Sequence, residues 1–243
     1  MCRAFIANMF VMQHIVAPMN KIIVHGIIAL AASMLASQIA QAQGTVTYLS
    51  NLGQPSMGGL AVDSGSWLAE GILTGNNTGG YVLNNVQLAM MGISGSPSGF
   101  TVMLYNQSGD LGGIDPGSSL GMMSGSSPTS DGTYTYTAPA HLLLSPDTYY
   151  FIVATSRPTV GYGAYSWSFT TASSYKPGDS WIESISLGSS DGLSSTWKQN
   201  PDGPQFEFLQ FAINATAVPE PDTMGLLGMG GLFFGLSRWK MSR

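Results

Sequence analysis

The chain has 243 residues, of which 9% are charged and 44% are hydrophobic. Disorder driven by excess charge is excluded, because this hydrophobic content is enough to build a core. Between residues 43 and 218, three basic side chains stand against eleven acidic ones, which leaves a net charge of −8. No basic patch is present to neutralise phosphates, so nucleic acid is excluded as a partner, and the acidity is typical of a solvated extracellular surface.

The N-terminal part of the chain has the three parts of a secretory signal. Lys21 supplies a basic start, and residues 22–39 are mostly apolar. Ala40 and Ala42 then place small residues at positions −3 and −1 of a cleavage site. The pattern predicts a signal helix that is cleaved after Ala42, so that Gln43 begins the mature chain. A retained transmembrane helix is the alternative interpretation.

Residues 1–18 form a lead that secretory signals seldom carry. Met19 begins a complete signal without them. We therefore predict that translation starts at Met19, that residues 1–18 are an extension outside the native protein, and that residues 19–42 are the signal peptide.

Short β-patterned runs, separated by clusters of turn residues, make up the body at residues 43–217. They cover residues 45–49, 66–73, 81–91, 100–105, 133–137, 141–144, 148–155, 165–171, 181–187 and 206–215. About ten such strands predict an all-β antiparallel sandwich or jelly roll rather than a parallel α/β sheet. The only cysteine of the chain is Cys2, so a disulfide framework and a thiolate metal site are excluded from the body.

Side-chain alternation predicts which faces of several strands are buried. Tyr134 and Tyr136 share one face of their strand, and the threonines around them share the other. Residues 149–154 are apolar throughout, which predicts a central strand that is covered on both faces. In the last strand, the early and late phenylalanines differ in parity, and a β-bulge near Leu209 and Gln210 would reconcile them.

The body also resembles a known family of surface domains. The resemblance rests on the order of its motifs: the strand at 100–105, the loop at 116–121, the Tyr-Thr-Tyr strand at 134–136, the run at 142–150 and the aromatic strand around Trp167. This order is similar to the choice-of-anchor R type of β-sandwich, which bacterial surface proteins carry with interchangeable anchoring tails. The resemblance implies a fold and brings no established chemistry.

A G-x-S-x-G pattern, the signature of a hydrolase nucleophile elbow, occurs at residues 117–121. Ser119 would be the nucleophile and His141, the sole histidine of the body, would be its base. The pattern follows Pro116 in a polar loop with no amphipathic helix after it, whereas an elbow needs a strand-to-helix turn. We therefore expect no serine hydrolase, no change of activity on mutation of Ser119, and no cofactor.

Three aspartates, Asp110, Asp115 and Asp131, occur in loops around a pair of glycines. Carboxylates on flexible loops bind Ca²⁺, so these residues are candidates for a structural calcium site. Their spacing does not match an EF-hand loop. The alternative interpretation is that they are solvated turn aspartates.

Carbohydrate chemistry has two sets of candidates in the body. Glu70, Glu183 and Glu207 are its only glutamates, but each lies in a strand pattern, and nothing places two of them about a sugar. Most tryptophans of the body are expected in the core. Trp197, between polar neighbours, is the best exposed candidate for a ligand contact.

The C-terminal segment, residues 218–243, has three parts. Its motif comprises Val218, Pro219, Glu220 and Pro221. A run of about thirteen mostly apolar residues follows at 224–236, against the roughly twenty needed to span a membrane with ease. The basic tip at residues 237–243 contains Arg238, Lys240 and Arg243, which the positive-inside rule holds in the cytoplasm.

This order of motif, apolar helix and basic tip resembles the PEP-CTERM sorting signal, which exosortase systems of Gram-negative bacteria recognise. The resemblance implies transient retention in the inner membrane, processing near the motif, and release to the envelope or an extracellular polymer matrix. An ordinary anchor with a proline-rich stalk is the alternative.

The sequence therefore predicts an exported, non-enzymatic surface protein that is associated with the envelope or with exopolysaccharide. A carbohydrate-binding module for self-produced polysaccharide is the first alternative, and a secreted hydrolase is a more distant one.

Overall fold

A computed structural model describes residues 44–95, 99–108, 114–156, 163–172, 180–193, 196–199 and 207–219. The chain folds into a compact unit over Thr45–Val218. The described residues contain strands and turns and no helix, and therefore none that is long and apolar enough to cross a membrane. The predicted signal helix and C-terminal apolar helix lie outside the described residues.

Fifteen strands are present in the described part of the chain. In order, they are β1 (Val46–Ser50), β2 (Gly58–Val62), β3 (Trp67–Leu73), β4 (Tyr81–Met90), β5 (Ser94–Gly95), β6 (Thr101–Gln107), β7 (Pro116–Met122), β8 (Gly132–Thr137), β9 (Leu143–Leu144), β10 (Tyr149–Thr155), β11 (Gly163–Thr170), β12 (Ile182–Ser189), β13 (Lys198–Gln199), β14 (Phe208–Leu209) and β15 (Phe211–Ala217).

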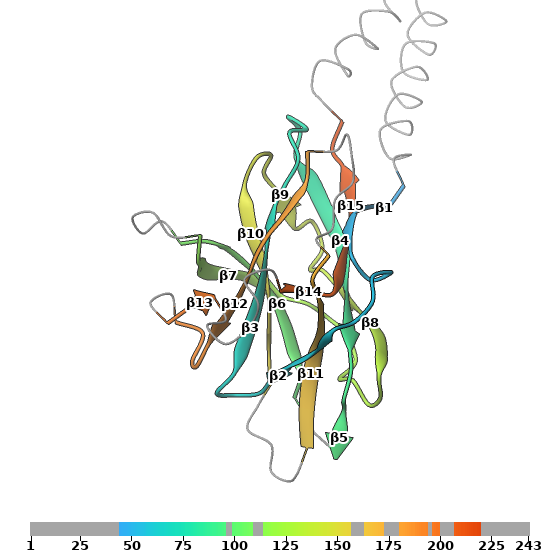
Figure 1. Cartoon of the computed structure of the whole chain (residues 1–243). Helices are drawn as coiled ribbons and strands as arrows, with labels where there is room; N and C mark the ends of the chain where they lie inside the picture. The colour runs from blue at the N-terminus through green and yellow to red at the C-terminus, as the bar shows by residue number, and fades with distance from the viewer. Residues whose placement is uncertain are drawn as a thin grey trace, which may run out of the picture. The chain divides into compact units, whose positions relative to one another are not determined.

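These strands form two antiparallel sheets that face each other (Figure 1). The six-stranded sheet has the order β13-β12-β3-β10-β6-β7. The nine-stranded sheet has the order β1-β15-β4-β11-β14, with β2 and β5 paired to β11 and with β8 and β9 paired to β4. The prediction of an all-β antiparallel fold is confirmed.

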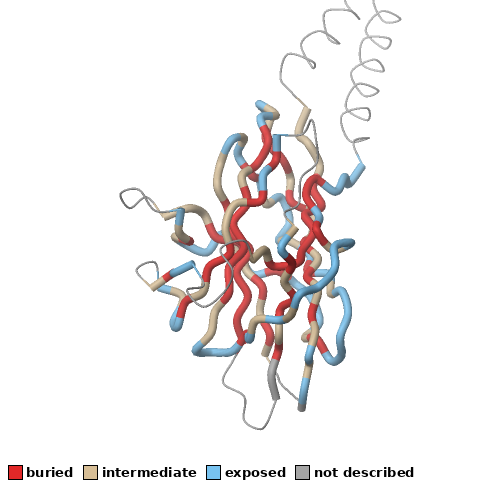
Figure 2. Tube along the Cα trace, viewed as in Figure 1, coloured by how far each residue is buried: buried red, intermediate tan, exposed pale blue. Residues whose placement is uncertain are grey.

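The main core lies between the two sheets, where the buried stretches of both run side by side (Figure 2). Trp167 of β11 and Phe211 of β15 enter it from one sheet, and Ile152 of β10 enters it from the other. At one end, Trp181 stacks on Tyr48 with ring centroids 5.0 Å apart. These large side chains are fully or almost fully removed from water, which is the main driving force for the fold.

The six-stranded sheet is buried on its outer face as well. Phe151 and Val153 of β10 point away from the main core, are completely buried, and form a second apolar cluster with Leu187, Trp197 and neighbours. Gly71 lies opposite Phe151 and leaves room for its ring, since an added Cβ would come within 3.0 Å of it. The prediction of a central strand covered on both faces is confirmed.

The alternation predicted for the Tyr-Thr strand is confirmed in β8. Tyr136 is buried in the main core, whereas Thr133, Thr135 and Thr137 on the opposite face are exposed. At β8, the nine-stranded sheet thus turns threonines outward, whereas β10 of the six-stranded sheet turns apolar side chains outward.

The predicted bulge in the last strand is wrong. The chain changes its partner strand from β11 to β4 at Gln210, but Leu209, Phe211 and Ile213 all stay fully buried on one alternation. No change of parity occurs, because Phe208 is half-buried and is not part of the main core. Gln210 is tolerated inside because its side chain accepts a hydrogen bond from Ser168 Oγ (2.6 Å) and donates one to a backbone carbonyl.

Candidate functional site

The start of the C-terminal motif is joined to the sandwich. Val218 N donates a hydrogen bond to Gly80 O (2.9 Å), and Asn77 Nδ2 donates one to Val218 O (2.9 Å). These contacts hold the end of the body beside the turn before β4. Apart from Val218 and Pro219, the predicted tail lies outside the described residues, as do the predicted cleavage residues Ala40, Ala42 and Gln43.

The G-x-S-x-G pattern lies within β7, at the edge of the six-stranded sheet, and not in the predicted loop. Ser119 pairs with Tyr105 in the β6–β7 ladder and is exposed. His141 lies in an exposed turn with a positive φ of 61°, just before β9 of the other sheet. An elbow requires a turn between a strand and a helix, whereas Ser119 lies inside a strand, and the described residues around it contain no helix.

The three candidate calcium ligands are only partly described, because Asp110 lies outside the described residues. Asp131 Oδ1 accepts a hydrogen bond from Ile93 N (3.2 Å), and the backbone oxygen of Asp115 accepts one from Ser108 N (2.7 Å). In the described ranges, no three acidic, histidine or cysteine side chains gather as metal ligands would. The calcium site stays a prediction.

Trp197 is buried, and the expectation that it is the best exposed tryptophan is wrong. Only 6% of its surface is accessible, because the ring packs into the apolar cluster on the outer face of the six-stranded sheet. Its polar neighbours in sequence, Thr196 and Lys198, are more exposed, whereas the Trp197 ring points inward. Trp67 is only half-buried, and Trp167 and Trp181 are core residues, as expected.

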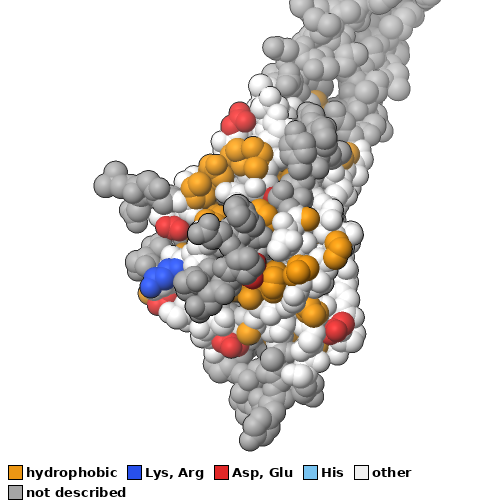
Figure 3. All heavy atoms as spheres, viewed as in Figure 1, with side chains coloured by type: hydrophobic (Ala, Val, Ile, Leu, Met, Phe, Trp, Pro, Cys, Tyr) orange, Lys and Arg blue, Asp and Glu red, His pale blue; other side chains and the backbone are white. Residues whose placement is uncertain are grey.

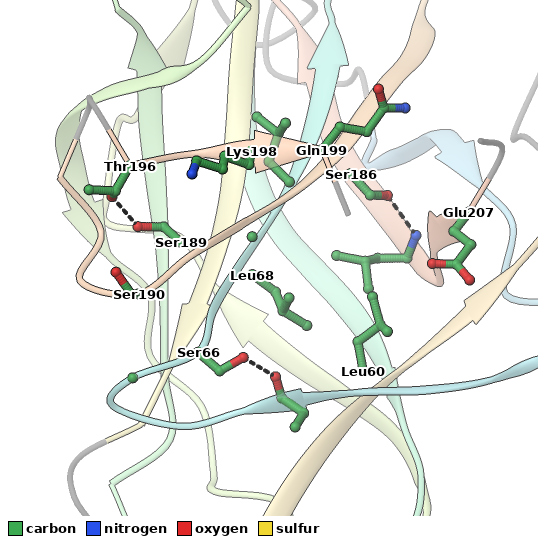
Figure 4. Close-up of a pocket in the computed structure, with 15 residues that line it drawn as sticks. Leu60, Ser66, Leu68, Ser186, Ser189, Ser190, Thr196, Lys198, Gln199 and Glu207 are labelled. Atoms are coloured by element: carbon green, nitrogen blue, oxygen red, sulfur yellow. Dashed lines mark hydrogen bonds between the residues drawn. The ribbon is translucent and has the colours of Figure 1, made fainter. Parts of the chain in front are cut away.

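A pocket of about 530 Å³ opens beside β12 and β13 of one sheet and β2 of the other (Figure 4). Hydroxyl groups dominate its polar lining, among them those of Ser66, Ser189 and Thr196. Ser189 and Thr196 hydrogen-bond to each other, which orients both hydroxyls. Lys198 and Glu207 bring one charge of each sign. Leucine side chains, among them Leu60 and Leu68, line the rest, so the pocket combines apolar surface with polar groups that could orient a ligand.

A buried acid lies next to this pocket. Ser186, which lines the pocket, donates a hydrogen bond through Oγ to Glu70 Oε2, and Leu209 N donates another at 3.0 Å. Glu70 is completely buried, and its Oε1 has no hydrogen-bond partner in the described part of the chain. Burial first, and then repulsion from Glu183, raises the pKa of Glu70 well above its usual range.

Glu70 and Glu183 therefore lie close together, which the sequence analysis did not expect. Glu183 is also buried, and its Oε1 accepts a hydrogen bond from Asn51 Nδ2 (2.8 Å). Neither residue lines the pocket, whereas Glu207 does. The signal for this cluster was present in the sequence, because Glu70 interrupts an otherwise apolar strand. Its partner across the sheet only becomes visible once β3 and β12 are paired.

The described surface is sparsely charged. On the face that Figure 3 shows, acidic side chains are scattered, basic atoms are confined to one small spot, and uncharged polar and hydrophobic atoms cover wide areas. This distribution agrees with the low charge content of the sequence. Long-range electrostatic attraction is therefore a weak means of recognition for this body, and short-range hydrogen bonding and packing carry more weight.

Comparison with known proteins identifies the C-terminal segment. Residues 217–238 match the family model described as the PEP-CTERM protein-sorting motif, which covers the predicted motif and the apolar run. No curated protein and no solved structure matches the chain. The match supports an exported protein that an exosortase recognises and sorts at the membrane through its C-terminal segment. The choice-of-anchor R resemblance of the body stays a prediction, because the matched residues lie in the tail.

Proposed function

We propose that this chain is a surface or matrix protein whose C-terminal segment is a temporary anchor. An N-terminal signal exports it, residues 224–236 hold it in the inner membrane, and an exosortase-type protease cleaves near residues 219–221. The body is then released to the envelope or the extracellular polymer matrix. The observation that carries this proposal is the match of residues 217–238 to the PEP-CTERM sorting motif.

Two physical features support a temporary anchor. An apolar run of about thirteen residues is short for a bilayer core, so it is a poor permanent span. The last residue of the compact unit, Val218, is held by Asn77 and Gly80. Cleavage after this point leaves every described strand intact, because β15 ends at Ala217.

The body acts by association and not by catalysis in this proposal. Ser119 lies in a strand ladder without an elbow, and Glu70 and Glu183 are buried and do not themselves line the pocket. The choice-of-anchor R resemblance is in keeping with such a role. The hydroxyl-lined pocket favours one alternative, a carbohydrate-binding module for self-produced polysaccharide. Turnover of an ester or a glycoside by the purified protein would instead support a hydrolase.

The test is fractionation of the native protein with intact-mass analysis, in cells with and without the exosortase. We expect a shortened form in the envelope or matrix fraction of normal cells. Without the exosortase, or with a Pro219→Ala/Glu220→Ala/Pro221→Ala variant, the uncleaved form should remain in the membrane fraction. Thr223→Ala, just outside the motif, is the matched control and should be processed normally. An unshortened protein in the membrane of normal cells would leave an ordinary anchor as the explanation.

A further inference from the structure

The outward face of the nine-stranded sheet carries amide and hydroxyl side chains across four neighbouring strands. None of the strands β1, β15, β4 and β8 contains a charged residue. Their outward side chains include Thr47, Asn214, Asn85, Gln87, Thr133 and Thr135, which we call the amide–hydroxyl face. The three threonines are exposed, Asn85 and Gln87 are half-buried, and Asn214 is buried between its neighbours.

Hydrogen bonds run across the strands and orient these side chains. Thr47 Oγ1 donates to Asn214 Oδ1 at 2.6 Å, and Asn214 Nδ2 donates to Asn85 Oδ1 at 2.8 Å. On the other side of β4, Gln87 Nε2 donates to Thr135 Oγ1 at 3.3 Å. The rotamers are thus restrained before any partner arrives, which lowers the entropy cost of binding.

The same groups keep hydrogen-bonding capacity for a partner. A primary amide has two N–H donors and a carbonyl oxygen with two lone pairs, and a hydroxyl has one donor and two acceptor positions. Each of these hydrogen bonds uses only part of this capacity. Thr133 and Thr135 are exposed, and Gln87 is half-buried, so their remaining donors and acceptors face outward.

The chemistry of this face selects one class of partner. A phosphate or carboxylate polymer needs cations, and these four strands supply none. A hydrophobic partner would leave the amides and hydroxyls without hydrogen bonds, which is costly. A neutral polymer with many hydroxyl groups both donates and accepts, and it matches the absence of charge. Adjacent strands lie about 4.8 Å apart, so the face presents such groups at regular short intervals.

We propose that the amide–hydroxyl face binds a neutral polysaccharide chain lying across β1, β15, β4 and β8. This inference rests on the proposed function, because sorting and release are what bring the body to an extracellular polymer. It goes further in naming the surface and the charge class of the polymer. The hydroxyl-lined pocket is not needed for it, since that pocket is formed by other strands.

The test uses the processed protein recovered from cells that carry the whole gene. The probe is the extracellular polysaccharide of the same cells, separated by anion exchange into neutral and anionic fractions and immobilised. The variant Gln87→Ala/Thr135→Ala removes both partners of one cross-strand hydrogen bond, so neither is left unpaired. Ser118→Ala/Ser119→Ala, on exposed positions of β7 in the other sheet, is the matched control.

We expect the wild-type protein and the β7 control to be retained by the neutral fraction, with retention that 0.5 M salt does not abolish. The Gln87→Ala/Thr135→Ala variant should be retained at least about fivefold less, with an unchanged melting temperature. Retention by the anionic fraction alone, or equal retention of this variant and the wild type, would overturn the inference. Dimers of the wild type that the variant abolishes, without polysaccharide binding, would also overturn it in favour of self-association.

Failure of this inference can be told apart from failure of the proposed function. If the processed protein reaches the matrix fraction but the Gln87→Ala/Thr135→Ala variant binds as well as the wild type, sorting stands and another surface makes the contact. If the unprocessed protein stays in the membrane in cells with the exosortase, the proposed function itself is wrong.

Discussion

The outer faces of the two sheets differ in kind. On the six-stranded sheet, Phe151, Val153 and Trp197 form a buried apolar cluster. On the nine-stranded sheet, the corresponding positions are threonines, asparagines and a glutamine joined by hydrogen bonds. The first face therefore contributes to stability by burial, whereas on the second Thr47, Thr133 and Thr135 are exposed and can make contacts outside the molecule.

Strand alternation explains this difference. β10 is apolar at every position from Tyr149 to Ala154, so both of its faces need cover. β8 alternates tyrosine with threonine, so only one of its faces does. A sandwich with one covered outer face and one open outer face should respond to mutation very unequally on its two sides.

The largest expected effect is that of Phe151→Ala. Its ring is completely buried outside the main core, and removal leaves a cavity against Gly71 and Val153. We expect the free energy of unfolding to fall by about 3–5 kcal/mol. Thr135→Ala, on the opposite outer face, should change it by no more than about 0.5 kcal/mol. Denaturant melts measure both, and similar losses would show that the two faces are not different in kind.

Trp197→Ala should also destabilise the fold, by about 3 kcal/mol, because the indole packs against Leu187 and its neighbours. Its Nε1 has no hydrogen-bond partner among the described residues, so the loss comes from packing alone. Trp67→Ala, at a half-buried ring, is the matched control and should lower the free energy of unfolding by less. A Trp197→Ala protein that melts normally yet loses polysaccharide retention would restore Trp197 as a ligand contact.

The smallest expected effect depends on pH and concerns Glu70, which lies between the two faces. Its folded pKa lies above the unfolded value of about 4.5, so the folded state binds the proton more tightly. Stability is therefore highest at acid pH and falls as the pH rises from about 4.5 through the folded pKa. Glu70→Gln cannot titrate, so its stability curve should be flatter than that of the wild type.

The two curves should diverge as the pH rises from 4 to 7, with Glu70→Gln gaining relative to the wild type. Chemical denaturation across pH 4–8 measures this difference. Glu183→Gln is the companion variant. It removes the repulsion between Glu183 and Glu70, so stability should fall at a lower pH in this variant than in the wild type. Parallel wild-type and Glu70→Gln curves would mean that another group governs the pH dependence.

Much of the sheet arrangement could be predicted from local patterns. Eight of the predicted runs correspond to strands of six or more residues. Among them is the tyrosine–threonine strand, whose alternation is a direct signature of a pleated surface. β2 and β7 were missed because Gly58, Gly59, Gly117 and Gly121 read as turn residues. Pairing with β11 and with β6 overrides this weak propensity.

The candidate sites were less predictable. Trp197 has polar neighbours in the chain, but its burial depends on β12 and on strands far away in sequence. The Glu70 and Glu183 cluster depends on the pairing of β3 with β12. The amide–hydroxyl face was readable strand by strand, yet no single strand shows that four uncharged strands are neighbours.

The sequence by itself determined the C-terminal sorting motif, because such a signal is read as a short linear segment and needs no partner elsewhere in the chain. It also determined the all-β class, because alternation with period two is local. The tertiary structure alone decided which outer face is covered, that Glu70 meets Glu183, and that Trp197 turns inward. These properties arise from contacts between residues far apart in the chain, and strand pairing is what brings those residues together.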